Sequence, residues 1–261
     1  MTHPLRFSAN ISLMFAEHEF LMRFSEAAKC QFRAVECHFP YEFAIADIKA
    51  QLEANDLVLN SINTAPGDMA RKEFGFAAVP DRQDDFRRTF EQALEYATAL
   101  QVPAIHCLSG HVAPDQHNAA RDCFLKNMSW AAQQLGTSQI DLLIEPLNGI
   151  DRPGYFVSRS DEIIKLLNEL GQSQVKLLFD VYHIQIMEGD LLRRLERHWS
   201  KIGHIQIASV PNRHEPDEGE IFYPAIFHAL QARKWLGWIG AEYIPRGRTQ
   251  DGLGWLSAWR N

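Results

Sequence analysis

Short apolar segments alternate with longer segments of helical periodicity along the chain. The short runs are rich in Val, Ile, Leu and Phe and are bounded by polar residues or Gly, a pattern that predicts β-strands. These predicted strands are residues 6–10, 34–37, 57–62, 104–107, 140–145, 175–180, 204–207 and 238–243. The clearest predicted helices are residues 19–30, 44–55, 84–100, 115–135, 159–170, 190–198 and 224–234.

Repeated alternation of strand and helix predicts a parallel sheet of the α/β class. Eight such units in 261 residues favour a closed (β/α)8 TIM barrel over an open doubly wound sheet. The open sheet lacks its usual motif support, because SANISLMF stands after the first strand in place of GxGxxG, and GxxxxGK[ST] is absent from the sequence. We therefore expect residues 1–261 to form a single TIM-barrel domain.

Strand alternation predicts which side chains point into the barrel at the ends of the last four strands. One parity places Glu145, Asp180, Gln206 and Glu242 on the inner face, at the end of the barrel where catalytic groups lie. The opposite parity is apolar and suits a layer of covering helices. It comprises Ile144, Ile205, Ile207, Ile239 and Ala241.

Three carboxylates at one end of a barrel repel one another unless a positive charge lies among them. A divalent cation supplies that charge, and four oxygen donors without a thiolate suit Mg²⁺ or Mn²⁺ better than Zn²⁺. Taken singly, each of these residues is better explained as a solvated or salt-bridged polar group at the end of the barrel. Their equivalent positions at strand ends favour the shared ion.

Charge and composition narrow the classes of partner. The formal net charge is −7, the sequence pI is near 5.9, and Lys and Arg are scattered, so we expect neither nucleic acid nor a membrane as partner. No apolar run approaches the roughly 20 residues of a membrane span, and MTHPLRFSAN has no apolar core of signal-peptide length. Four cysteines without a CxxC pair indicate free thiols and a cytoplasmic protein.

Several motifs, spaced along nearly the whole chain, resemble the hydroxypyruvate isomerase family of the xylose-isomerase-like barrels. They are FSANISLMF, VEC.FPY, NTAPGD, LLIEPLN, FDVYH, HIQIA.VPNRHEPDEGEI.YP and WIGAEY.PRG. The resemblance implies a (β/α)8 barrel with one divalent metal, held by Glu145, Asp180, Gln206 and Glu242. It further implies that Glu145 and Glu242 move a proton between adjacent carbons of the substrate.

The activity implied by the resemblance is the conversion of hydroxypyruvate to tartronate semialdehyde through an enediolate. A cation stabilises the developing negative charge, while two carboxylates serve as base and acid. His183 resembles the family's contact to a substrate oxygen, and Arg213 is placed to bind the substrate carboxylate. Glu220 either favours the start of the following helix or orients Arg213 or His183.

Other interpretations stay open at this point. The same motifs suit a 2-dehydrotetronate (2-oxo-tetronate) isomerase and, more remotely, a ketose 3-epimerase. A phosphodiesterase of the endonuclease IV type needs more metal ions and a basic face, and a binding protein does not need two glutamates in the pocket. Asn10, Glu36 and His106 end earlier strands and are candidates for the opposite wall, although His106 is better explained as a core residue. Tryptophans near the C-terminal end suit either internal packing or a homo-oligomer contact.

Overall fold

Each of the eight predicted apolar runs forms a strand in the computed structural model, which describes residues 4–259. The strands are β1 (Arg6–Asn10), β2 (Ala34–Cys37), β3 (Val58–Asn63), β4 (Ala104–His106), β5 (Asp141–Ile144), β6 (Val175–Asp180), β7 (Ile202–Ile207) and β8 (Trp238–Ala241). The α-helices are α1 (Phe20–Lys29), α2 (Ile45–Ala54), α3 (Gln83–Leu100), α4 (His117–Leu135), α5 (Ser160–Leu170), α6 (Val181–Met187), α7 (Leu191–His198) and α8 (Tyr223–Ala232). Four short 3-10 segments complete the elements: η1 (Met69–Arg71), η2 (Pro114–Gln116), η3 (Trp199–Lys201) and η4 (Thr249–Ala258).

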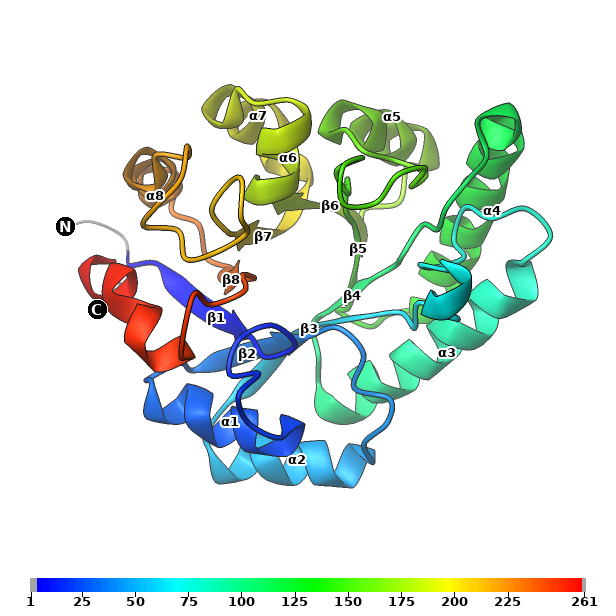
Figure 1. Ribbon diagram of the computed structural model, residues 1–261. Coiled ribbons are helices and arrows are strands. Elements are labelled where there is room, and N and C mark those ends of the chain that lie inside the picture. Colours follow the sequence, from blue (N-terminus) through cyan, green and yellow to red (C-terminus); the bar gives the residue numbers. More distant parts are fainter. Residues whose placement is uncertain (1–3, 260–261) are drawn as a thin grey trace.

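The strands follow chain order around a closed barrel, and every neighbouring pair is parallel. Closure is made between the first and last strands, where Phe7 is aligned with Ile239 and Ala9 with Ala241. The helices surround this central ring of strands (Figure 1). The predicted α/β class and (β/α)8 TIM barrel are confirmed.

The predicted parity of the strands is also confirmed. Ile144, Ile205 and Ile239 are fully buried in the large apolar layer between the strands and the helices. Leu143 and Leu178, on the opposite parity, form a separate small cluster with Ala104 inside the barrel. Alternation along the strands therefore separates an outer apolar core from an interior in which polar groups are found.

The structure differs from the predicted elements mainly around β6. Helix α6, which was not predicted, begins at Val181, directly after the strand. Asp180 ends the strand and also caps the helix, because its side chain accepts a hydrogen bond from the Tyr182 backbone N–H at 2.8 Å. The fifth and eighth strands are shorter than predicted, so Glu145 and Glu242 lie immediately after them.

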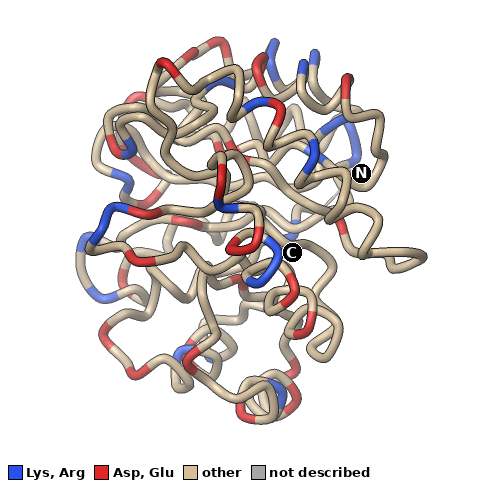
Figure 2. The backbone as a smooth tube through the Cα atoms, turned by 90° about the vertical axis from the view of Figure 1, so that its right-hand side faces the viewer, with Lys and Arg blue, Asp and Glu red and all other residues tan. Residues whose placement is uncertain are grey.

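Aromatic packing accounts for the tryptophans near the C-terminal end. The ring of Trp255, in η4, lies 5.3 Å from that of Phe7 in β1, and Trp259 lies 4.9 Å from Phe227 in α8. These contacts attach the last segment to the start of the barrel (Figure 1). Within residues 4–259 no helix is both long and apolar enough to cross a membrane. In the backbone view of Figure 2, acidic and basic residues are interspersed along the chain.

Candidate active site

A pocket of about 610 Å³ lies at the end of the barrel where the strands finish. Its walls come from residues that follow successive strands, as expected for this architecture. The lining includes His38, Asn63, His106, Glu145, Asp151, Arg152, Tyr182, His183, Arg213 and Glu242. Four of the residues predicted from sequence, namely Glu145, His183, Arg213 and Glu242, therefore share one cavity.

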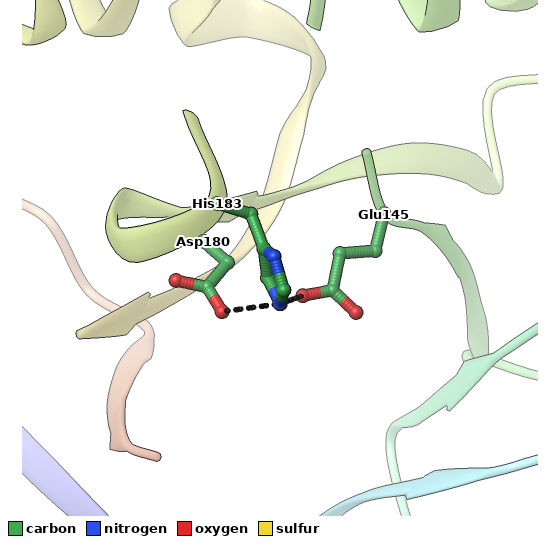
Figure 3. A group of neighbouring side chains, drawn as sticks. All are labelled: Glu145, Asp180 and His183. Atoms are coloured by element: carbon green, nitrogen blue, oxygen red, sulfur yellow. Dashed lines mark ion pairs between the residues drawn. The ribbon is translucent and has the colours of Figure 1, made fainter. Parts of the chain in front are cut away.

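Two of the predicted metal ligands, Glu145 and Asp180, lie close together at this pocket, in a group that His183 completes. Three of the four predicted ligands have a buried oxygen without a hydrogen-bond partner among the described residues. Asp180 is aligned with Gln206 across β6 and β7, and ligand atoms of Glu145 and Asp180 lie within 4.8 Å of each other (Figure 3). Glu145 Oε1, Asp180 Oδ2 and Gln206 Oε1 are all buried, and none has a hydrogen-bond partner among residues 4–259. Unpaired buried oxygens are costly, so three together fit a site that holds a hard cation.

The electrostatics of the carboxylates support this interpretation. Burial raises the pKa of Glu145 well above its usual value, and the nearby charges of Asp180 and Glu242 add to the rise. Burial likewise raises the pKa of Asp180 to about 7. Arg213 offsets part of this rise in both groups, but the net shift of each pKa is upward. A divalent ion among these carboxylates would stabilise their charged forms.

Glu242 differs because a guanidinium donates a hydrogen bond directly to its carboxylate. Its Oε1 accepts a hydrogen bond from Arg213 Nη2 at 2.6 Å and lies 3.3 Å from His38 Nε2. Burial alone would raise the pKa of Glu242, but Arg213 and His38 more than offset that and hold it at about 2. The two predicted proton carriers therefore lie in opposite electrostatic environments.

Arg213 contacts both Glu242 and Asp180. Its Nη2 also lies 3.7 Å from Asp180 Oδ2, and its guanidinium lies 5.0 Å from the centre of the Tyr182 ring. The backbone at Arg213 is left-handed, with φ of 55°, and its N–H donates to the Ser209 carbonyl at 2.9 Å. A contact from Arg213 to a substrate carboxylate stays a prediction.

His183 lies beside the ligand cluster, with its Nε2 3.7 Å from both Glu145 Oε1 and Asp180 Oδ2 (Figure 3). Its Nδ1 accepts the Asn148 backbone N–H at 3.1 Å, so the proton of the neutral ring is on Nε2. Burial, with Arg213, lowers the pKa of His183 well below its usual value, which keeps the ring neutral. A ring that carries its proton on Nε2 is a hydrogen-bond donor there and not a metal ligand.

The ends of the earlier strands supply three pocket residues, His38, Asn63 and His106, and two buried interior residues, Asn10 and Glu36. His106 lines the pocket with its Nδ1 3.4 Å from Glu145 Oε2, and burial lowers its pKa to about 3. Asn10 Nδ2 lies 3.3 Å from Glu36 Oε1 and 3.2 Å from His38 Nε2. Glu36 is not part of the pocket lining but lies inside the barrel.

Glu220 does not take the orienting role that the sequence suggested. It is exposed, and its Oε1 accepts a hydrogen bond from Gln185 Nε2 at 3.0 Å. No hydrogen bond or ion pair joins it to Arg213 or His183 in the part of the chain that the structure describes. Of the two roles left open by the sequence, the orienting one therefore has no supporting contact, and Glu220 lies exposed in the loop after β7.

A second guanidinium lies in the pocket and was not predicted from the sequence. Arg152, in the loop after β5, lies 3.9 Å above the ring of Phe74, which comes from the long loop after β3. Among residues 4–259 no carboxylate forms an ion pair with Arg152. Because Arg152 is not at a strand end, the only signal was a lone basic residue in the loop NGIDRPG.

Comparison with known proteins agrees with this architecture. The family model described as xylose isomerase-like TIM barrel matches residues 24–259. The chain is 47% identical to a 2-oxo-tetronate isomerase of Cupriavidus necator, with 97% of this chain and 98% of the relative covered. It is 40% identical to the hydroxypyruvate isomerase of Escherichia coli, with 98% and 100% covered.

The crystal structure of a Brucella melitensis protein, named AP endonuclease, family 2, superposes with a TM-score of 0.96 at 42% identity, over 99% of this chain and 100% of that one. A D-psicose 3-epimerase from Clostridium cellulolyticum, at 18% identity and a TM-score of 0.78 over 95% and 89% of the two chains, shares the fold. The matched family model and the two isomerase relatives confirm the resemblance found in the motifs. The chain belongs to the xylose isomerase-like TIM barrel family.

Proposed function

We propose that this isomerase moves a carbonyl group between C2 and C3 of a short 2-oxo sugar acid, with one divalent cation bound by Glu145, Asp180, Gln206 and Glu242. The observation that carries the proposal is the set of three buried, unpartnered oxygens on Glu145, Asp180 and Gln206 beside the pocket. All four donors are oxygens, which favours Mg²⁺ or Mn²⁺. The ion would stabilise the negative charge that develops on the substrate oxygens.

The protein's own groups would carry the proton. One of Glu145 and Glu242 removes a proton from C3 and the other returns one to C2, while the hydrogen of the C3 hydroxyl is transferred to the C2 oxygen, so the atoms balance. Both carboxylates line the same pocket, as this exchange requires. His183, with its proton on Nε2, would donate a hydrogen bond to a substrate oxygen.

The substrate carboxylate needs a positive partner that the ion site does not use. Arg213 is committed to Glu242 and Asp180 in this structure, whereas Arg152 has its guanidinium held against Phe74 without an ion pair among the described residues. A guanidinium fixed on an aromatic face keeps its edge donors available for a carboxylate. We therefore propose that Arg152, in place of the Arg213 predicted from the sequence, binds the substrate carboxylate, and that Arg213 balances the charge of the ion site.

The four-carbon substrate is favoured over hydroxypyruvate. The relative from Cupriavidus necator is named for 2-oxo-tetronate and is 47% identical, against 40% for the hydroxypyruvate isomerase. Both acids present the same carboxylate, carbonyl and neighbouring hydroxyl. A cavity of about 610 Å³ leaves room for the additional carbon.

The name of the Brucella melitensis protein raises a different class, an enzyme acting on DNA. A formal net charge of −7, with Lys and Arg scattered along the sequence among acidic residues, does not favour binding to a phosphate backbone. The lining of the pocket, with two glutamates facing one cavity, instead suits proton transfer on a small acid.

A direct test compares kcat/KM for 2-oxo-tetronate and hydroxypyruvate, using protein stripped with chelator and then supplied with Mn²⁺ or Mg²⁺. We expect no turnover in chelator, recovery on addition of either ion, and the higher kcat/KM with 2-oxo-tetronate. Full activity in the presence of chelator would contradict the proposed requirement for a divalent cation. Turnover of neither acid by the ion-loaded enzyme would contradict the carbonyl transfer.

A further inference from the structure

Glu36 is a buried carboxylate inside the barrel that lies outside the pocket lining. It sits on β2 with 1% of its surface exposed. Five side chains from β1, β3 and β7 direct donors at its two oxygens. They are Gln206 Nε2 at 2.7 Å and Asn10 Nδ2 at 3.3 Å on Oε1, with His204 Nε2 at 2.8 Å, Ser8 Oγ at 3.2 Å and Asn60 Nδ2 at 3.4 Å on Oε2.

The barrel makes room for this carboxylate at one position of β8. A Cβ atom at Gly240 would lie 2.4 Å from Glu36 Oε1, closer than any real contact of that kind. Gly240 is aligned with Gln206 on the neighbouring strand, so the space that the glycine leaves lies next to the residue that donates to Glu36. Glycine at this site therefore permits Glu36 to reach Gln206 across the interior.

The contact determines which end of the Gln206 amide faces the ion site. A carboxylate only accepts hydrogen bonds, so the group at 2.7 Å from Glu36 Oε1 must be the amide nitrogen. Gln206 Oε1 then points away from Glu36, and it is buried without a partner among the described residues. An amide turned the other way would present N–H groups to a cation and oppose its binding.

We propose that Glu36 is a positioning residue that holds the Gln206 amide with its oxygen toward the divalent ion. The inference rests on the ion site of the proposed function, since Glu36 acts only through a ligand to that ion. Groups behind a ligand change metal affinity by about 10- to 100-fold when they are replaced. Glu36 thus links the earlier half of the barrel to a site whose ligands come from the later half.

The test is the affinity of the protein for Mn²⁺, measured by isothermal titration calorimetry without substrate. In Glu36→Gln, four amide and imidazole groups compete for a single remaining oxygen, so we expect Mn²⁺ affinity to fall by about tenfold or more. The exchange Glu36→Gln with Gln206→Glu restores a donor facing a carboxylate and leaves one oxygen toward the ion. We expect this double variant to recover the lost affinity.

Glu188→Gln is the matched control, because Glu188 is also a buried side chain in an ion pair, with Arg194 at 2.7 Å, on the outer side of the barrel. It should leave Mn²⁺ affinity unchanged even where it lowers the melting temperature. Wild-type affinity in folded Glu36→Gln would overturn the positioning role while leaving the ion site intact. Should that variant not fold, failure of the folded exchange variant to bind Mn²⁺ would overturn it. Absence of Mn²⁺ binding to the wild-type protein would instead reject the ion site and, with it, any role for Glu36.

Discussion

Glu36 and Glu145 are both glutamates buried inside the same barrel, with 1% and 5% of their surfaces exposed, yet their surroundings are opposite. Both oxygens of Glu36 accept hydrogen bonds from neighbouring side chains. Glu145 Oε1 has no donor among the described residues, and its nearest charged neighbours include Asp180 and Glu242. Two similarly buried glutamates thus have different roles. Glu36, whose oxygens are hydrogen-bonded, orders the side chains of the interior, whereas Glu145, with an oxygen that lacks a donor, is suited to bind a ligand.

The greatest loss of activity should follow replacement of Glu242, on the pocket side of the barrel. In Glu242→Gln the amide oxygen can still face an ion, but the side chain no longer accepts or returns a proton. We expect kcat to fall by ~10²- to 10⁴-fold, and solvent deuterium incorporation at the reacting carbon of the substrate, followed by NMR, to fall with it. Net isomerisation at the wild-type rate would exclude Glu242 as a proton carrier.

Replacing Arg152 should give the next largest effect. Arg152→Met keeps a long apolar side chain against Phe74 and removes the charge, so the loss of a charge-assisted contact of about 1.5–3 kcal/mol should raise KM roughly 10- to 100-fold. Steady-state kinetics with 2-oxo-tetronate measure this. Arg121→Met, at the exposed ion pair with Glu169, is the control and should leave KM unchanged. An unaltered KM in Arg152→Met would transfer the carboxylate contact to another residue.

Removing one of the hydrogen-bond donors to Glu36 should lower the stability of the protein. Ser8→Ala takes away a fully buried donor that lies 3.2 Å from Glu36 Oε2, while His204 and Asn60 continue to serve that oxygen. We expect the free energy of unfolding to fall by about 1 kcal/mol, measured by urea denaturation. Unchanged stability would show that the other donors fully compensate.

The smallest effect is expected at Glu220, which contacts Gln185 at the rim and does not take part in the site. Glu220→Gln should alter kcat/KM by less than about twofold, in line with exposed substitutions worth about 0.5 kcal/mol or less. A tenfold loss in a steady-state assay would mean that the loop after β7 moves Glu220 inward during turnover.

Alternation along the strands predicted much of this molecule. The two-residue period placed Leu143 and Leu178 inside and Ile144 and Ile205 outside, because sheet geometry fixes the direction of each side chain. The same rule placed Glu145 and Glu242 at one end of the barrel, where both line the pocket. His183 and Arg213, which line it too, were predicted from the family resemblance and from the loop after the seventh strand.

The two-residue period of the strands could not predict contacts between loops and strands that are distant in the sequence. Arg152 reaches Phe74 from a different loop, and no periodicity encodes the path of either loop. Helix α6 was missed because VYHIQIM is apolar on most sides and continues the strand without a break. Glu36 was recognised at a strand end, but its position away from the pocket depends on the missing side chain at Gly240, on another strand.

The difference between the two buried glutamates depends on whether the unpartnered oxygens at the end of the barrel form one site for a hard divalent ion. An anomalous-scattering map from crystals soaked in Mn²⁺ would locate such an ion without any assumption about the reaction. We expect one peak within about 2.0–2.6 Å of oxygens from Glu145, Asp180, Gln206 and Glu242. No peak at those oxygens, together with full isomerase activity in the presence of chelator, would contradict the ion site.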